Sequence, residues 1–310
     1  MKLFSHWRIK IVVVIAVLLL AGTIGVSAYV GYGLTHPARE TIDSNPQAAN
    51  LNFEDVAFSS QKDQTLLRGW WVPAQTEPSL ITPSGKTVIF VHGYTSSRLV
   101  KSAQVMPLAQ RLSHAGYNVL MFDLRGAGNS DGKIVTLGQN EQYDVLAAIE
   151  FAKTEKQSEH IALLGWSMGA VTSILAGTES NDIQAIIADS PFSDLHNYIT
   201  TNLPIWSGLP RYPFTPLILT ITPVAFGLYP ESVSPVHSLA KLNDRGLLLI
   251  HSCKDTAIPC QNSQEIYNAL ADKAHAELWL TQRGDHVKSY IEYGSEYEAR
   301  VLGFLEKYLR

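Results

Sequence analysis

Six short, mostly apolar runs, separated by segments with helical patterns, constrain the fold of this chain more than any other feature. The runs cover residues 88–91, 119–122, 161–164, 183–188, 247–250 and 277–280. Strands without polar alternation are buried on both faces, which is typical of a mostly parallel sheet covered by helices. The segments between the runs, such as 107–114 and 140–154, carry helical periodicity. The repetition predicts a doubly wound α/β sheet.

An antiparallel hairpin is expected ahead of these runs. Residues 53–59 and 65–72 alternate apolar and polar side chains around a polar turn at 61–64. Together with the six runs, the hairpin predicts a sheet of about eight strands. A length of 310 residues allows one large domain over 53–310, because a single α/β fold commonly reaches about 250 residues.

Composition and charge exclude two other classes of protein. The chain is 46% hydrophobic and 17% charged, unlike a disordered protein, so a buried core is expected. The net charge is −4, and no basic run is interleaved with aromatic residues, so a nucleic-acid partner is not expected. No pattern in the chain predicts an oligomeric state.

The first 34 residues differ from the rest of the chain. Residues 11–34 are 24 consecutive residues without a charge, which is long enough to span a bilayer. Lys2, Arg8 and Lys10 precede this run, whereas only Arg39 follows it closely. The positive-inside rule therefore predicts a single-pass anchor in the cell membrane, with the N-terminus in the cytoplasm and the large domain outside. The alternative is a cleaved signal peptide and a secreted domain, since residues 26–28 are small.

Two further segments interrupt the regular pattern. Residues 35–52 are polar and contain two prolines, which predicts a tether between anchor and domain. Residues 191–235 contain eight prolines and many aromatic residues, and they separate two expected strands that a crossover of a dozen or so residues could join. We expect a helical lid inserted over the carboxyl edge of the sheet. The alternative is a packed helical excursion without a role in substrate binding.

A Gly-x-Ser-x-Gly pattern is centred on Ser167, between the run 161–164 and a helical stretch at 170–176. A serine hydroxyl is a weak nucleophile unless a tight turn from strand to helix holds it exposed beside a base, and flanking glycines permit that turn. The start of the helix also adds a partial positive charge beneath the serine. The pattern predicts Ser167 as a nucleophile.

A serine nucleophile needs a histidine base and an acid, which follow it along the chain in the order acid, then histidine. His286 follows the last expected strand and is the predicted base. Asp255 follows the strand before it and is the predicted acid, with Asp189 as the alternative. His251 ends a strand and is expected to be structural, and Asp285 is expected to point away from its neighbour His286.

Acyl transfer also needs donors for the oxyanion, one from the residue after the nucleophile and one from the turn after the third strand. These are the backbone N–H groups of Met168 and Tyr94, the latter following His92-Gly93 at a strand end. The alternative for His92-Gly93 is a simple turn.

The segment from Asp123 to Ser130 resembles a phosphate loop only superficially. It lacks the third glycine and the lysine of such loops, so we expect a structural turn in which Asp123 and Arg125 brace neighbouring loops. No cluster of Cys, His and carboxylate residues has metal-ligand spacing, and no cofactor is expected.

These patterns, in this order, resemble the α/β-hydrolase superfamily over residues 53–310, and most closely the N-terminally anchored bacterial BEM46-like and serine aminopeptidase-like hydrolases. The matching patterns are strand-His-Gly, Asp-x-Arg-Gly-x-Gly-x-Ser, Gly-x-Ser-x-Gly, Asp-Ser-Pro, Asp-x-x-x-Pro and Gly-Asp-His. The chain departs from the family at Ser252, where glycine is common, and at two cysteines that flank Asp255. The resemblance implies hydrolysis of an ester, amide or thioester through an acyl-enzyme.

The aromatic lid favours a hydrophobic acyl substrate, which makes a carboxylesterase the first expectation. The alternatives are a peptidase or amidase of the serine aminopeptidase type and a catalytically silent, anchored binding module. The expected partners are a small-molecule, peptide or lipid-like substrate and the membrane.

Cys253 and Cys260 are the only cysteines, and they bracket Asp255. In an exported domain they can form a disulfide, although two buried thiols are equally compatible with the sequence. Our hypothesis is that the bridge forms and fixes the direction of the acid.

Overall fold

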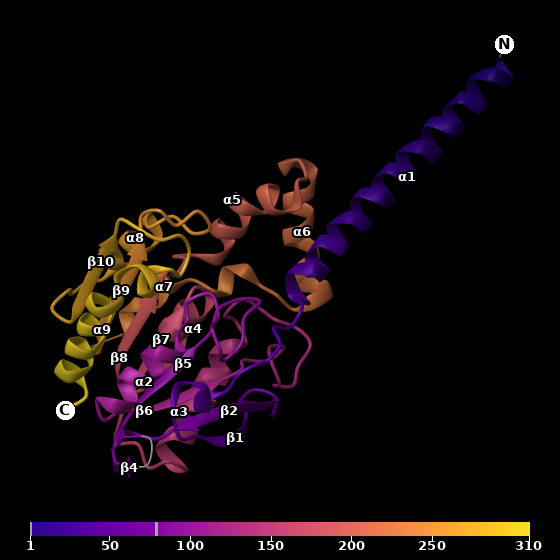
Figure 1. Ribbon diagram of the computed structural model, residues 1–310. Helices are drawn as coiled ribbons and strands as arrows, with labels where there is room; N and C mark the ends of the chain where they lie inside the picture. The colour runs from indigo at the N-terminus through magenta and orange to yellow at the C-terminus, as the bar shows by residue number, and fades with distance from the viewer. Residues whose placement is uncertain (1, 78–79, 243) are drawn as a thin grey trace.

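The computed structural model describes residues 2–77, 80–242 and 244–310, and its centre is an eight-stranded sheet (Figure 1). The strands lie in the order β1-β2-β6-β5-β7-β8-β9-β10. Their bounds are β1 Glu54–Ser59, β2 Leu66–Val72, β5 Lys86–Val91, β6 Asn118–Phe122, β7 His160–Trp166, β8 Ile183–Asp189, β9 Gly246–Ser252 and β10 Ala276–Thr281. Strands β5 to β10 run parallel, and β1 and β2 pair antiparallel as the predicted hairpin. The doubly wound, mostly parallel sheet is confirmed. A separate small sheet pairs β3 Gln75–Glu77 with β4 Leu80–Ile81.

Helices cover both faces of the sheet. On one face lie α2 Met106–His114 and α9 Ser289–Tyr308. On the other lie α3 Glu141–Thr154, α4 Met168–Glu179 and α8 Gln261–Ala269. The central strands have apolar side chains on both faces because each face packs against a helix layer.

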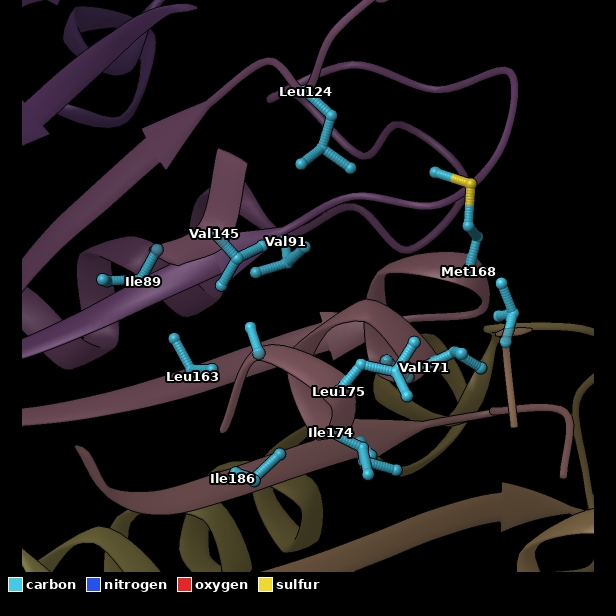
Figure 2. Packing of buried hydrophobic residues seen from close by; sticks show 14 of the residues in the cluster. Ile89, Val91, Leu124, Val145, Leu163, Met168, Val171, Ile174, Leu175 and Ile186 are labelled. Atoms are coloured by element: carbon cyan, nitrogen blue, oxygen red, sulfur yellow. The ribbon is translucent and has the colours of Figure 1, made fainter. Parts of the chain in front are cut away.

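The core behind the candidate site packs α4 against the central strands. Figure 2 shows Ile89, Leu163 and Ile186 of the sheet near Val171 and Ile174 of α4, and all five side chains are buried. Full burial of one such side chain is worth about 1.5–3 kcal/mol. This packing fixes the start of α4 relative to the ends of β5, β7 and β8.

The N-terminal helix α1, Lys2–Thr35, extends away from the body of the molecule (Figure 1). Its segment from Trp7 to Thr35 has 29 residues and a mean hydropathy of 2.7. In the described part of the chain it is the one helix that is long and apolar enough to cross a membrane, judged by length and composition. The predicted anchor lies within this helix.

The segment after α1 is fastened to the domain along its length. The guanidinium group of Arg39 donates to the carbonyl oxygens of Ser130 and Gly132, both at 2.5 Å. Lys101 pairs with Asp43 at 2.7 Å. A 3-10 helix, η1 Pro46–Ala49, follows before β1. Residues 35–52 therefore hold the end of α1 in a defined place on the domain.

The expected insertion contains two helices, α5 Leu195–Ser207 and α6 Arg211–Phe226. Asp194 caps α5 by accepting a hydrogen bond from the backbone N–H of Asn197 at 2.9 Å. Short turns of helix follow, namely η2 Pro230–Ser232, α7 Pro235–Ser238 and η3 Leu239–Lys241. Helices α5 and α6 project from the body beside the lower end of α1 (Figure 1).

Candidate active site

Ser167 occupies a strained turn between β7 and α4. Its φ is 54° and its ψ is −123°, a combination that L residues rarely adopt and that costs about 1–3 kcal/mol. A Cβ atom on Gly169 would lie 2.0 Å from the carbonyl oxygen of Val91, so only glycine allows α4 to begin this close to β5. The backbone N–H of Ser167 donates to the carbonyl oxygen of Asp189 at 2.8 Å and ties the turn to β8.

The structure brings the predicted nucleophile, base and acid together in one hydrogen-bonded chain. Nε2 of His286 lies 2.8 Å from Oγ of Ser167, and its Nδ1 lies 2.7 Å from Oδ2 of Asp255. An ionised carboxylate can only accept, so Nδ1 carries the proton that points to Asp255. Nε2 is then free to accept the hydroxyl proton of Ser167. This is the arrangement that a histidine base needs.

The carboxylate of Asp255 is held in the ionised state. Burial alone would raise its pKa, but hydrogen bonds from His251 and His286 lower the pKa by more, so the net pKa lies below its usual range. Its Oδ1 also accepts the backbone N–H groups of Ala257 and Ile258 at 2.9 and 2.8 Å. Such bonds favour a charged carboxylate.

Asp189, the alternative acid, has other partners. Its Oδ1 accepts the hydroxyl of Ser190 at 2.9 Å, and its Oδ2 accepts that of Tyr297 at 3.0 Å. Burial raises the pKa of Asp189 to about 6. Nδ1 of His286 donates its hydrogen bond to Asp255 and not to Asp189.

His251 touches the acid, which the sequence did not reveal. The side chain is fully buried; its Nε2 lies 2.8 Å from the carbonyl oxygen of Ile258 and 3.3 Å from Oδ2 of Asp255. Nδ1 lies 2.7 Å from Oγ of Ser263. Because both oxygens near Nε2 only accept, this nitrogen carries the proton. His251 is therefore a positioning residue for Asp255.

The loop that carries His286 is fastened to the loop that carries Asp255. Asp285 points away from His286, and its Oδ1 accepts the backbone N–H and the hydroxyl of Thr256, each at 2.8 Å. These bonds lower the pKa of Asp285. The hydroxyl of Ser252 donates to the carbonyl oxygen of Gly284 at 2.5 Å. The departure from glycine at this position thus adds a contact to the histidine loop.

Cys253 and Cys260 are joined in a disulfide, with their Cα atoms 5.0 Å apart. The bridge closes the short loop around Asp255.

The residues of the two predicted oxyanion donors line the same cavity as Ser167. Met168 is the first residue of α4, so its N–H is one of the amides that the helix itself leaves without a partner. Tyr94 follows β5 and lines the same cavity as Ser167 and Met168. The turn before it is held by His92, which is buried, and whose Nδ1 and Nε2 bond the carbonyl oxygen of Gly93 and the N–H of Leu124 at 2.8 and 2.9 Å.

Two cavities meet at Ser167 and His286. The larger, of about 370 Å³, has a wall of apolar and aromatic side chains. The residues that form that wall are Leu34, Tyr94, Leu137, Met168, Phe192, Leu195, Tyr198, Ile199, Trp206, Ala257 and Ile258. We call it the apolar cavity. The smaller, of about 240 Å³, is lined by apolar residues such as Val100 and Val287 but also by Glu40, Ser96 and Ser102. We call it the polar cavity because of this carboxylate and these hydroxyls.

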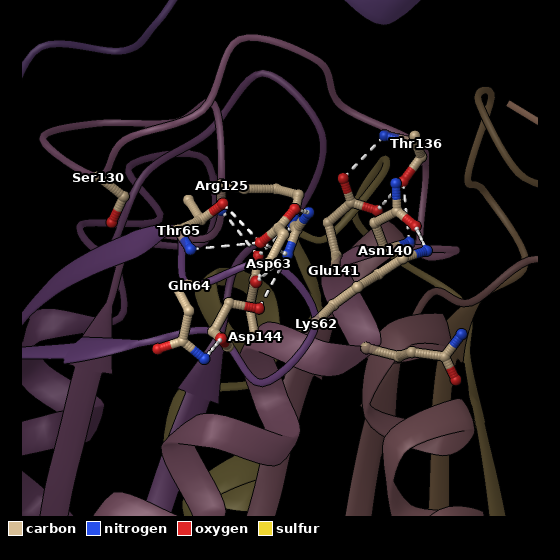
Figure 3. Close-up of polar contacts among 12 residues, drawn as sticks. Lys62, Asp63, Gln64, Thr65, Arg125, Ser130, Thr136, Asn140, Glu141 and Asp144 are labelled. Atoms are coloured by element: carbon tan, nitrogen blue, oxygen red, sulfur yellow. Dashed lines mark hydrogen bonds and ion pairs between the residues drawn. The ribbon is translucent and has the colours of Figure 1, made fainter. Parts of the chain in front are cut away.

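Charged networks brace the loops around the site, as expected for Asp123 and Arg125. Asp123 forms a buried ion pair with Arg98 at 2.6 Å. Arg125 pairs with Asp144 and Asp63, both at 2.8 Å (Figure 3). The segment that resembles a phosphate loop is thus a structural turn. Over residues 2–77, 80–242 and 244–310, no three His, Cys, Asp or Glu side chains are grouped to hold a metal ion.

Comparison with known proteins agrees with this geometry. A family model described as serine aminopeptidase matches residues 82–224. The uncharacterised protein YqkD of Bacillus subtilis is 30% identical over 71% of this chain and 71% of its own. The esterase YjfP of Escherichia coli is 29% identical over 62% of this chain and 77% of its own.

A solved structure extends the similarity to the whole fold. The Pyrococcus furiosus esterase Pf2001 has a TM-score of 0.72 and 29% identity, covering 89% of this chain and 99% of the esterase. These relatives support an enzyme of the hydrolase type. The eight-stranded sheet, the family model and the esterase relatives lead to one conclusion: the chain belongs to the α/β-hydrolase superfamily.

Proposed function

We propose that this protein is a serine carboxylesterase that cleaves esters with an apolar acyl group. The observation that carries the proposal is the hydrogen-bonded chain from Ser167 through His286 to Asp255 at the floor of the apolar cavity. The similarity to two esterases supports an ester rather than an amide as substrate.

The geometry supports a two-step reaction. Nε2 of His286 takes the proton of Ser167 as Oγ attacks the carbonyl carbon of the ester, and the N–H groups of Tyr94 and Met168 receive the oxyanion. The tetrahedral intermediate then breaks its bond to the alcohol oxygen, which leaves with the proton from Nε2. Water, deprotonated by the same nitrogen, attacks the acyl-enzyme, and Ser167 regains its proton as the carboxylic acid departs. Asp255 holds the imidazole in the required tautomer throughout.

The experiment that tests this proposal combines labelling and turnover. A fluorophosphonate probe should label the wild-type chain and the Ser59→Ala control, in which an exposed serine of β1 is removed, but not Ser167→Ala. A series of p-nitrophenyl esters of rising acyl length is assayed beside aminoacyl p-nitroanilides. Unchanged esterase activity in Ser167→Ala would exclude the mechanism, and faster cleavage of the anilides would favour a peptidase.

We also propose that α1 anchors the protein in the cell membrane with the large domain outside. The length and hydropathy of Trp7–Thr35 and the basic residues before it support this placement. Intact mass of the protein isolated from membranes distinguishes an anchor from a cleaved signal. Protease treatment of whole cells should remove the domain if it faces outward.

A further inference from the structure

We propose that the apolar cavity opens onto the bilayer surface and that the substrate is a single-chain amphiphilic ester that enters it from the membrane. This inference rests on the proposed esterase function and on α1 as the anchor. It is carried by the end of α1, by the insertion and by the pair of cavities at Ser167.

The end of the apolar helix α1 is part of the active-site wall. Leu34 lines the apolar cavity together with Ser167. The hydroxyl of Tyr94 donates to the carbonyl oxygen of Leu34 at 2.8 Å, so the turn that supplies an oxyanion donor is bonded to the helix. The carbonyl oxygen of Thr35 accepts the N–H of Val135 at 2.8 Å. The point where α1 would leave a bilayer is therefore the edge of the acyl site.

The insertion packs directly against this end of α1. A Cβ atom on Gly31 would lie 2.9 Å from Cγ2 of Thr222 in α6, so the two helices are in close contact there. The rings of Tyr32 and Phe226 meet edge to face, with centroids 6.1 Å apart. Figure 1 shows α5 and α6 on the side of the domain from which α1 emerges. A bilayer around α1 would therefore meet the insertion first.

The tip of the insertion exposes large apolar side chains on that side. Ile205 and Tyr212 are each 75% exposed, and Trp206 is 48% exposed. Trp206 also lines the apolar cavity, so the same side chain faces both solvent and the cavity that holds Ser167. Tryptophan and tyrosine are favoured where membrane meets water. The tip therefore forms an apolar path from the bilayer surface into the cavity.

The polar cavity, which shares Ser167 and His286 with the apolar cavity, completes an amphiphilic site. Glu40, which follows α1, lines it together with Ser96 and Ser102. The carboxylate of Glu40 accepts the hydroxyl of Ser97 at 2.6 Å. A negative charge at this place repels an anionic head group and suits a neutral, hydroxyl-bearing one. A monoacylglycerol has the required chemistry, with one acyl chain and an uncharged polyol.

The test uses the full chain reconstituted in phosphatidylcholine vesicles, with 1-oleoylglycerol in the bilayer and p-nitrophenyl butyrate in the water. The double variant Ile205→Ser with Tyr212→Ser removes apolar surface from the tip without touching the cavity wall. The matched control is Leu80→Ser with Ile81→Ser, which removes two exposed apolar side chains from β4 at the far end of the domain. We expect the tip variant to lose about tenfold in turnover of 1-oleoylglycerol and nothing on p-nitrophenyl butyrate. The control should match the wild type on both.

A second readout is independent of activity. Tyr212→Cys, labelled with an environment-sensitive fluorophore, should be quenched by nitroxide lipids, whereas labelled Ile81→Cys should not. An unquenched label at 212, equal loss on both substrates, or a wild type that cleaves p-nitrophenyl butyrate but not 1-oleoylglycerol would each overturn the inference. Failure of the wild type to cleave p-nitrophenyl butyrate, or to react with fluorophosphonate at Ser167, would instead count against the esterase function.

Discussion

The carboxylate of Asp285 accepts both the backbone N–H and the hydroxyl of Thr256, so the residue beside the proposed base is bonded to the residue beside the proposed acid. His286 and Asp255 are 31 positions apart in the chain. The separation between their loops is thus set by a direct contact. That contact helps to keep Nδ1 of His286 within 2.7 Å of Oδ2 of Asp255.

The first prediction concerns this contact. Asp285→Ala should lower kcat by about three- to tenfold with little change in KM, because misplacement of the base weakens the transition state more than substrate binding. Asp285→Asn keeps an acceptor oxygen and should recover most of the activity. Steady-state kinetics on a soluble p-nitrophenyl ester provide the measurement. A rise in KM at constant kcat would show that the contact does not position the base.

A second prediction addresses His251. His251→Phe removes the N–H that lies 3.3 Å from Oδ2 of Asp255, so kcat should fall by roughly tenfold, whereas His251→Gln retains a donor and should fall less. Fluorophosphonate labelling at Ser167 should slow in the same order. The two variants would have equal kcat if His251 served only to fill space.

A third prediction follows from the buried carboxyl of Asp189. Burial raises its pKa to about 6, so above pH ~4 the folded protein keeps a proton that the unfolded chain has lost. The contribution to stability is therefore fully present below pH ~4 and is lost as the pH rises through about 6. The difference between this pKa and the usual pKa of an aspartate corresponds to roughly 3 kcal/mol in the free energy of unfolding.

Asp189→Asn should remove this dependence. The Tm of the wild type minus that of Asp189→Asn should decline by several degrees from pH 4 to pH 7. The same difference for Ser59→Ala, a substitution of an exposed and non-titrating residue in β1, should stay flat. A constant difference for Asp189→Asn would mean that its carboxyl is already ionised at pH 4.

A fourth prediction concerns the head group. Glu40→Gln keeps an acceptor for Ser97 but removes the negative charge from the polar cavity. The ratio of turnover on oleoyl lysophosphatidate to that on 1-oleoylglycerol should rise several-fold, because Coulomb repulsion of the phosphate is lost. An unchanged ratio would place the head group away from Glu40.

The sheet was predictable because each of its parallel strands contains a short run of mostly apolar residues. Runs such as 119–122 contain no polar residue, and each of the six lies in a strand of the structure. The order of the chemical residues along the chain predicted Ser167 and His286 for one site and left Asp255 and Asp189 as candidates for the acid. The chain order does not, however, say which acid lies within reach of the histidine. The structure decides between them, because Nδ1 of His286 bonds Asp255, whereas Asp189 bonds Ser190 and Tyr297.

The sequence did not predict the contacts that loops make, or the contacts between segments far apart in the chain. His251 ends a strand, and its contact with Asp255 exists only because the following loop turns back on itself. Leu34 belongs to an apolar run that predicts a membrane anchor. Nothing in that run predicts that Leu34 lines the same cavity as Ser167. Such contacts arise from tertiary packing between segments far apart in sequence, which periodicity does not encode.

The last prediction concerns the disulfide. A loop closed by Cys253 and Cys260 is short, and on the chain-entropy model such a bridge is worth about 2–3 kcal/mol. The structure shows that Asp255 is also held by the N–H groups of Ala257 and Ile258. The bridge therefore shares the task of orienting the acid with these hydrogen bonds.

Cys253→Ser with Cys260→Ser should accordingly lower kcat by about two- to fivefold and lower Tm by a few degrees, rather than abolish activity. Reduction of the wild type with dithiothreitol should reproduce the loss in kcat, and the double variant should not respond to the reductant. Because disulfides persist in oxidising compartments, the protein isolated from membranes without any reductant should show no free thiol after denaturation. Two titratable thiols in that preparation would contradict both the bridge and the outward placement of the domain.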